Sequence, residues 1–342
     1  MERYPQSENH LKMKDPLRQC SGSALSDQTA ERSLAGPLVL TVDVEDYFQV
    51  SGFEDIVPRS QWERFESRVE RNTDQLLKIL ADAKATATFF VLGWIAERHP
   101  ALVRSIHGTG HEIACHSYDH RLIYQCAPDA FREDARRAKR ILENLIGERV
   151  IGYRAPSFSI TRKSLWALDI LAEEGFEYDS SIFPILRDRY GMPGAPRFPF
   201  QVPVNGRSEM LEIPPSTLRL LGLTLPLGGG GYLRLFPEGL FRWALEHIRN
   251  VERKVIVLYI HPWELDPDQP KIANAPGLST FRQYVNLDKT EGRLRRLLAT
   301  FPPVAIRTIL TRLNAEARFW APTDPSSSRR APEHTNQGAA LR

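Results

Sequence analysis

Strand-like and helix-like segments alternate along most of this chain, and this alternation limits the possible folds more than any other feature of the sequence. Largely apolar runs at 38–42, 87–91, 150–153 and 255–260 are separated by segments with apolar residues at helical spacing. Strands that are apolar throughout are typical of a parallel sheet covered by helices. A repeat that continues over about 270 residues favours a closed (β/α) barrel. An open doubly wound sheet is the alternative, but no G-x-G-x-x-G motif follows the first strand.

The composition is that of an ordinary globular protein, with 42% hydrophobic and 25% charged residues among 342. A net charge of +3 is too small to indicate a nucleic-acid partner. Three cysteines imply no disulfide framework and favour a reducing compartment. The first 34 residues lack the apolar core of a secretory signal, and no run reaches the roughly 18 apolar residues of a transmembrane segment. We therefore expect a soluble, cytoplasmic protein.

Both ends of the chain are polar and lack periodicity. We predict a flexible N-terminal segment at 1–36, one folded domain at 37–314 and a disordered tail at 315–342. Within the domain, the clearest helix is expected to begin at Pro128 and to end at Gly147.

Polar residues follow several of the predicted strands. They are Asp43, Glu45 and Asp46, then His116 and His120, Arg154 with Pro156, Glu212, and finally His261 to Glu264. Because the C-terminal ends of the strands meet at one mouth of an α/β barrel, these five pieces predict a single site. His116 and His120 are four residues apart, a spacing at which two imidazoles on one helical turn can bind one metal ion.

These pieces, in this order, resemble the motifs of polysaccharide deacetylases with the NodB homology fold, carbohydrate esterase family 4. The motifs are Thr-Val-Asp-Val-Glu-Asp at 41–46, His-Ser-Tyr-Asp-His at 116–120, Arg-Ala-Pro-Ser-Phe at 154–158 and Ile-His-Pro-Trp-Glu at 260–264. The resemblance spans residues 38–306. It implies a distorted (β/α) barrel, a divalent metal that is usually zinc, and hydrolysis of an N-acetyl group from an amino sugar.

Four further segments are similar to the branch of this family that is associated with exopolysaccharide export and exosortase gene clusters. They are Asp-Val-Glu-Asp-Tyr-Phe-Gln-Val at 43–50, Tyr-Asp-Ser-Ser at 178–181, Gly-Gly-Gly-Tyr at 229–232 and Phe-Arg-Gln-Tyr-Val-Asn-Leu at 281–287. This resemblance implies a polysaccharide or its lipid-linked precursor as substrate, and an association with the export machinery.

The first motif departs from the common family pattern of two adjacent aspartates followed by glycine. Asp43 and Glu45 are two residues apart, so on an extended strand they project from the same face. We assign Glu45 as the third metal ligand beside His116 and His120, and Asp43 as the general base. Asp46 is the alternative ligand, because the strand is free to turn there.

The remaining roles follow from the resemblance and from the chemistry of amide hydrolysis. His261 is assigned as the acid that protonates the leaving amine, and Arg154 as the cation that keeps Asp43 ionised. A backbone N–H near Ser157 is expected to hold the oxyanion, and Trp263 and Tyr232 are expected to contact the sugar.

Three further features are interpreted less specifically. The role of Glu212 stays open, and the tract Gly228–Gly231 is expected to be a mobile loop of the binding groove. An excess of arginine between 186 and 235 favours an anionic glycan or a lipid-linked intermediate as substrate. The arginines are Arg187, Arg189, Arg197, Arg207, Arg219 and Arg234.

Two other functions compete with polysaccharide deacetylation. One is hydrolysis of a linear or cyclic amide of a small molecule on the same barrel. The other is non-catalytic glycan binding within the export machinery.

Overall fold

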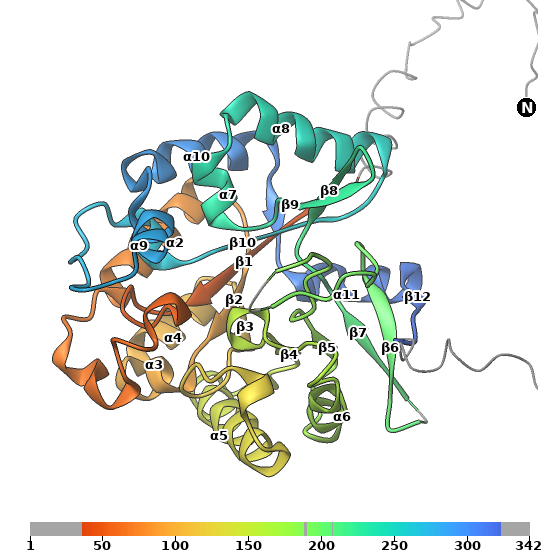
Figure 1. The fold of residues 1–342 in the computed structure, drawn as a ribbon, viewed down its shortest axis with the longest axis horizontal. Helices are drawn as coiled ribbons and strands as arrows, with labels where there is room; N and C mark the ends of the chain where they lie inside the picture. Colours follow the sequence, from red (N-terminus) through yellow and green to blue (C-terminus); the bar gives the residue numbers. More distant parts are fainter. Residues whose placement is uncertain (1–35, 188–189, 207, 323–342) are drawn as a thin grey trace, which may run out of the picture. The chain divides into compact units, whose positions relative to one another are not determined.

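The computed structural model describes residues 36–187, 190–206 and 208–322 (Figure 1). One sheet has the order β10-β1-β2-β3-β4-β5-β7-β6-β12, with β11 paired to β1. Its strands are β1 (Leu38–Val44), β2 (Thr88–Val91), β3 (Glu112–Cys115), β4 (Gly152–Tyr153), β5 (Tyr178–Asp179), β6 (Phe200–Val204), β7 (Ser208–Glu212), β10 (Ile256–Ile260), β11 (Pro303–Val304) and β12 (Arg318–Phe319). Neighbouring strands run parallel, except that β6 and β7 are antiparallel.

The sheet curls into a ring that two residues after β7, Ser216 and Gly228, close against β10. Ser216, which follows β7, donates its backbone N–H to the Val257 carbonyl of β10 at 2.9 Å and accepts from Val257 N through its hydroxyl at 2.8 Å. Tyr259 N, also on β10, donates to the Gly228 carbonyl at 2.6 Å. The expected distorted (β/α) barrel is therefore confirmed. The barrel is distorted because β7 and β10 do not pair directly, and the loop after β7 bridges them instead.

Helices surround the strands (Figure 1). They are α2 (Val69–Asp82), α3 (Gly93–Arg98), α4 (Pro100–Gly108), α5 (Pro128–Ile146), α6 (Trp166–Glu173), α7 (Gly230–Leu235), α8 (Glu238–Glu246), α9 (Gly277–Tyr284), α10 (Thr290–Thr300) and α11 (Ile306–Glu316). The bounds expected for α5 are confirmed, because Gly147 adopts a left-handed φ of 73° and ends the helix. No helix in the described part of the chain is long and apolar enough to cross a membrane.

Alternation along β1 directs polar side chains into the barrel. Leu38 and Leu40 pack against the outer helices. Val39 belongs instead to a second hydrophobic cluster inside the barrel. This cluster also contains residues of α11 and residues in or next to the other strands of the ring. Because successive side chains of a strand point to opposite faces, Thr41 and Asp43 continue the inner row of Val39. The inner row therefore ends in polar residues at the C-terminal end of β1.

The C-terminal boundary of the domain was predicted too early. Strand β11 ends at Val304, and α11 begins at Ile306. Helix α11 and strand β12 extend beyond residue 314, and the Trp320 ring packs on Phe200 with centroids 5.1 Å apart. These contacts with β6 stabilise a segment whose own sequence has no periodic pattern. Residues 323–342 of the expected tail, and 1–35 of the expected flexible segment, lie outside the described residues.

Candidate active site

A cavity of about 420 Å³ opens at the C-terminal ends of the barrel strands. Five predicted site residues line it: Asp43, Glu45, His116, His120 and His261. Ser157 and Trp263 line it as well. Its walls also include the side chains Tyr124, Phe158, Tyr190, Leu278 and Arg282. The structure thus brings together residues from positions up to 220 apart in the sequence, as expected for the mouth of a barrel.

Glu45, His116 and His120 form one buried cluster. One ligand-type atom from each lies within 4.8 Å of the others. His116 Nδ1 lies 2.8 Å from the Arg154 carbonyl oxygen, so Nδ1 carries the proton and Nε2 is left to bind a ligand. The loop after β3 is not the expected helical turn, since Ser117 and His120 have positive φ values of 63° and 59°. The two imidazoles still converge, with ring centroids 5.5 Å apart.

The contact between Glu45 and His120 has the geometry of two ligands of one ion. Glu45 Oε2 lies 2.9 Å from His120 Nε2, yet this buried oxygen has no hydrogen-bond partner among the described residues. Such an atom is expected to have a partner that the protein itself does not supply. Two imidazoles and one carboxylate are the donor set of catalytic zinc sites, and they leave positions open for water and substrate. The residues therefore fit a divalent metal.

The protonation states of the cluster agree with this fit. Burial lowers the pKa of His116 to about 4, so its imidazole is neutral at physiological pH. Burial opposes the charged form of Glu45, but His120 and His261 lower its pKa to about 2. The cluster thus offers a neutral imidazole and an anionic carboxylate, which are the forms that bind a cation.

Asp46 is directed away from this cluster. Its Oδ2 accepts from Ser67 Oγ and Arg68 N at 2.8 Å each and from Val69 N at 3.2 Å. These backbone groups begin α2, so Asp46 caps that helix from 22 residues upstream. The geometry favours Glu45 over Asp46 as the third ligand.

Asp43 is held by Arg154 on the inner face of the barrel. Arg154 Nη1 lies 2.7 Å from Asp43 Oδ1 and 2.8 Å from Thr41 Oγ1. Arg154 Nε donates to the Ser180 carbonyl at 3.1 Å, and Nη2 donates to the Ser180 hydroxyl at 2.8 Å. Arg154 is fully buried. A buried cation whose three nitrogens each donate a hydrogen bond keeps the carboxylate fixed in place.

His261 lies between two carboxylates and is oriented by a third. Its Nε2 is 3.3 Å from Glu45 Oε1 and 4.0 Å from Asp43 Oδ2, while Nδ1 is 2.9 Å from Glu264 Oε1. Burial opposes the imidazolium, but Glu45, Glu264 and Asp43 raise the pKa of His261 to about 9. The ring therefore carries both protons at neutral pH, and the Nε2 proton faces the cavity.

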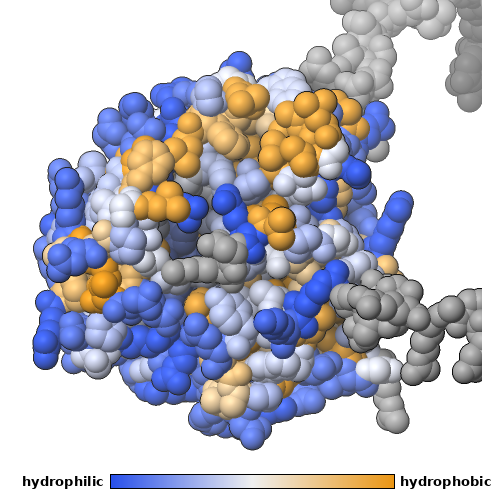
Figure 2. All heavy atoms as spheres, in the orientation of Figure 1, coloured by the Kyte–Doolittle hydropathy of each residue, from blue (hydrophilic) through white to orange (hydrophobic). Residues whose placement is uncertain are grey.

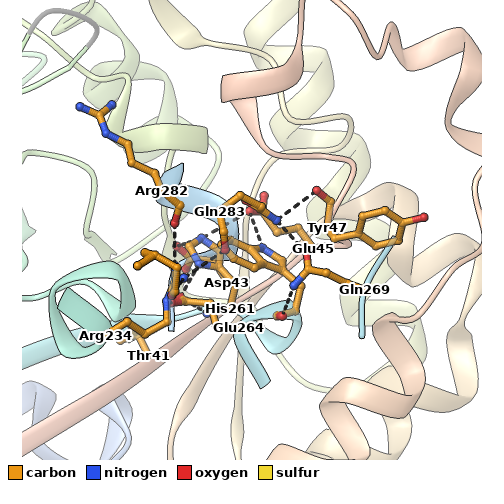
Figure 3. A network of polar contacts seen from close by, with 12 residues as sticks. Thr41, Asp43, Glu45, Tyr47, Arg234, His261, Glu264, Gln269, Arg282 and Gln283 are labelled. Atoms are coloured by element: carbon orange, nitrogen blue, oxygen red, sulfur yellow. Dashed lines mark hydrogen bonds and ion pairs between the residues drawn. The ribbon is translucent and has the colours of Figure 1, made fainter. Parts of the chain in front are cut away.

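Glu264 and Arg234 are functional residues that sequence reasoning missed. Arg234 Nε donates to Glu264 Oε2 at 2.8 Å, and both side chains are buried (Figure 3). The remaining Arg234 donors bind the carbonyls of Arg282, Gln283 and Val285. The sequence signal for Glu264 was its position three residues after His261, which allows one carboxylate to accept from both the ring and the backbone N–H of that histidine.

The excess of arginine that favoured an anionic substrate is partly used in internal ion pairs. Arg234 is paired with Glu264, and Arg197 is paired with Glu252 at 2.7 Å and bound to Thr217. These two charges are therefore balanced within the protein, although Arg234 also lines the cavity. Arg189 and Arg207 lie outside the described residues.

The glycine tract is also not the open loop that we expected. Gly230 begins α7, and an added Cβ there would lie 2.2 Å from Glu264 Oε1. At Gly229 it would lie 2.6 Å from the Tyr259 hydroxyl oxygen. These glycines let the backbone approach the polar network closely.

The three residues expected to contact substrate differ in placement. Ser157 lines the cavity and donates its hydroxyl to Ser51 Oγ at 2.7 Å. Trp263 is buried and stacks on His261, with centroids 4.9 Å apart, so it supports the histidine ring. Tyr232 is not among the described residues that line the cavity, although its neighbour Gly231 is.

Glu212 lies outside the cavity, behind Arg154. Its Oε1 accepts from Ile182 N at 2.9 Å. Burial and the neighbouring Asp179 raise its pKa well above the usual range. Burial also raises the pKa of Asp179, to about 6. Both carboxyl groups are therefore protonated more readily in the folded protein than free side chains are.

Comparison with known proteins divides the chain into two matched parts. Residues 55–178 match the family model described as polysaccharide deacetylase, and residues 180–311 match a domain of unknown function (DUF3473). His116, His120 and Arg154 lie in the first part, and His261 lies in the second. Asp43 and Glu45 precede both. The active-site cluster is thus assembled across the two matched parts.

Curated relatives match a limited stretch of the chain. It is 32% identical over 110 residues to the peptidoglycan deacetylase-like protein FGM2 of Gibberella zeae, which is 32% of each chain. It is 29% identical over 100 residues to a chitooligosaccharide deacetylase of Rhizobium leguminosarum bv. trifolii, which is 29% of this chain and 44% of that protein. The chain therefore spans less than half the length of these relatives.

The fold extends further than these sequence matches. A putative polysaccharide deacetylase from Mycobacterium smegmatis superposes with a TM-score of 0.59 at 22% identity, over 85% of this chain and 94% of that one. This similarity concerns the fold alone. Residues 55–178 therefore match the polysaccharide deacetylase family model, and the fold around them is that of a solved protein described as a putative member of that family.

Proposed function

We propose that this protein is a metal-dependent hydrolase that removes N-acetyl groups from the amino sugars of a polysaccharide or of its lipid-linked precursor, in exopolysaccharide biosynthesis and export. One observation carries the proposal. A three-ligand cluster of the zinc type, a carboxylate held by arginine and a protonated histidine all line one cavity. The names of the relatives, which are deacetylases of acetylated sugars, support the choice of substrate class.

The metal ligands would be Glu45, His116 and His120. A bound divalent ion, with Zn²⁺ the first choice for this donor set, supplies Lewis-acid activation of water and of the acetyl carbonyl. The carbonyl oxygen of Arg154 orients the His116 ring through Nδ1. This support fixes the direction of one ligand before an ion arrives.

Asp43 is the general base in this proposal. Its Oδ1 is held by Arg154, so Oδ2, on the side of His261, is the atom that can take a proton from the attacking water. Arg154 keeps the carboxylate in position through its hydrogen bond to Oδ1 and leaves Oδ2 unoccupied by that contact. A backbone N–H near Ser157 would hold the developing oxyanion.

His261 is the general acid. An amine is a poor leaving group unless its nitrogen is protonated as the C–N bond breaks. The imidazolium of His261 has the proton on Nε2, on the cavity side, and Glu264 holds the opposite ring nitrogen. Acid and base are thus separate groups with different neighbours, since Arg154 holds Asp43 and Glu264 holds His261.

Metal analysis combined with acetate release tests the proposal. The purified full chain should hold about one divalent ion, release acetate from N-acetylated chitooligosaccharides, lose this activity with a chelator and regain it with Zn²⁺. Turnover of allantoin or an imide without acetate release would instead make it a small-molecule amide hydrolase. Oligosaccharide binding without metal or turnover would make it a glycan-binding protein. Cell fractionation and co-purification with export components test the cytoplasmic location and the export association.

A further inference from the structure

The β8–β9 hairpin presents an apolar tip to solvent. Strands β8 (Thr217–Leu220) and β9 (Leu223–Pro226) pair antiparallel, with Leu218 opposite Leu225 and Leu220 opposite Leu223. Side chains that alternate along paired strands place these four leucines on one face. Leu218, at the base, is buried, whereas Leu220 and Leu223 are 41% and 65% exposed. The apolar face therefore continues from the core into solvent.

Leu221 at the turn is more exposed still, at 94%. Leu221 and Gly222 both have positive φ, 49° and 81°, as a tight two-residue hairpin turn requires. Asparagine and glycine adopt this conformation at little energetic expense, but a leucine is strained in it and here buries almost nothing in return. Folding of the hairpin alone does not explain a leucine at this position.

The charge around the tip is positive. No Asp or Glu occurs between Ile213 and Pro237. Arg219 on the hairpin is exposed. At the base of the hairpin, Arg197 binds both Thr217 and Glu252. The two sequence neighbours of Glu252, Val251 and Arg253, are exposed. Figure 2 shows further hydrophobic surface on the same face, in the region of β8, β9 and α8. Leu240 and Trp243 of helix α8 are 49% and 45% exposed.

We propose that the β8–β9 hairpin contacts the surface of an anionic lipid bilayer. Leu220, Leu221 and Leu223 enter the boundary between headgroups and acyl chains, and Arg219 and Arg253 bind lipid phosphates. Tryptophan is favoured at the headgroup level, which suits Trp243.

A protein partner fits these observations less well. The three leucines together expose the equivalent of two whole leucines, which is less than the roughly 800 Å² that each partner buries in a standard protein interface. A projecting tip also needs a matching pocket in a protein, whereas a bilayer accepts any shape that inserts. This inference does not depend on the proposed enzymatic function.

Sedimentation of the full chain with vesicles tests it. We expect binding to vesicles containing phosphatidylglycerol, weaker binding to pure phosphatidylcholine, and loss of the difference at high salt. Leu221→Asn is the sharpest variant, because asparagine suits the turn and should preserve the hairpin. It should weaken binding by about tenfold, and Arg219→Gln by about fivefold. Phe319→Ser, which removes an exposed apolar residue on β12, is the matched control and should bind like wild type.

Three results would overturn the proposal. They are absence of wild-type binding to anionic vesicles, equal binding by wild type and Leu221→Asn, and a change in oligomeric state in Leu221→Asn measured by light scattering. The last result would make the hairpin a contact between copies of the chain. Thermal unfolding of each variant checks that the fold is intact.

Discussion

His261 Nδ1 lies 2.9 Å from Glu264 Oε1, and Arg234 holds the second oxygen of that carboxylate at 2.8 Å. This relationship leaves His261 Nε2 as the nitrogen that faces Asp43 and Glu45. It also gives the proposed acid a negative partner three residues away in the same short turn, Pro262–Leu265.

Glu264→Gln should lower turnover and narrow the pH range of activity. Glu264 is one of the carboxylates that raise the pKa of His261, so its neutral replacement lets the ring lose its proton at lower pH. The alkaline limb of the kcat/KM profile should move to lower pH, while bound metal is unchanged. An unmoved alkaline limb would show that Glu264 serves only to support the fold.

Glu45→Gln and Asp46→Asn should have different effects. Loss of the Glu45 charge should remove most of the bound metal, because only His116 and His120 remain as strong ligands. Asp46→Asn should keep the metal and lower the free energy of unfolding by about 1–2 kcal/mol through weaker capping of α2. Metal analysis and urea unfolding give the two readouts. A metal-free Asp46→Asn protein that unfolds like wild type would reverse the assignment.

Asp43→Asn should separate the base from the metal site. The variant keeps the shape of the side chain but cannot accept a proton, so turnover should fall by about 10²–10⁴-fold with metal retained. Arg154 loses a buried charged partner in the same variant, so some loss of stability is also expected. Thermal unfolding measures that part separately. Loss of metal on this substitution would make Asp43 a ligand.

Gly230→Ala should disturb the acid through packing alone. The added methyl group would meet the Glu264 carboxylate at 2.2 Å and displace it from His261. The matched control is Gly231→Ala in the same helix, where no described atom lies within 4 Å of the added carbon. We expect a fall in kcat with metal retained for Gly230→Ala and a much smaller change in kcat for Gly231→Ala. Equal activity of the two variants would contradict the geometry around Glu264.

Glu212→Gln should change how stability depends on pH. Burial and Asp179 raise the pKa of Glu212 above its unfolded value, so the folded state binds more protons and loses stability as pH rises through the folded pKa. Glutamine does not titrate, so the variant lacks this pH-dependent contribution to the free energy of unfolding. It should therefore lose less stability than wild type between pH 5 and pH 8. Urea unfolding at both values measures this. Glu209→Gln, an exposed change on the same strand, should follow the wild type. Identical pH dependence of Glu212→Gln and wild type would show that the folded state binds no extra proton at Glu212.

Much of the scaffold could be predicted from the sequence because it depends on local backbone geometry. The two-residue period of a strand places Thr41 and Asp43 on the face of Val39, and the 3.6-residue period of a helix marks the buried side of α5. Apolar strands that alternate with helices imply a parallel sheet, and the C-terminal ends of its strands meet at one mouth of the barrel. These patterns are sufficient to predict that Asp43, His116 and His261 lie at one mouth of the barrel.

Contacts between distant residues were decided only by the tertiary structure. The sequence alone could not choose between Glu45 and Asp46, because the choice depends on the start of α2, which lies 22 residues away and takes up Asp46. Likewise, the sequence indicated Arg234 as one of several cations available to a ligand. In the structure Arg234 is buried and paired with Glu264, which lies 30 residues further along the chain. A buried charge must find a partner, and which partner is within reach depends on how the loops pack rather than on any local period of the chain.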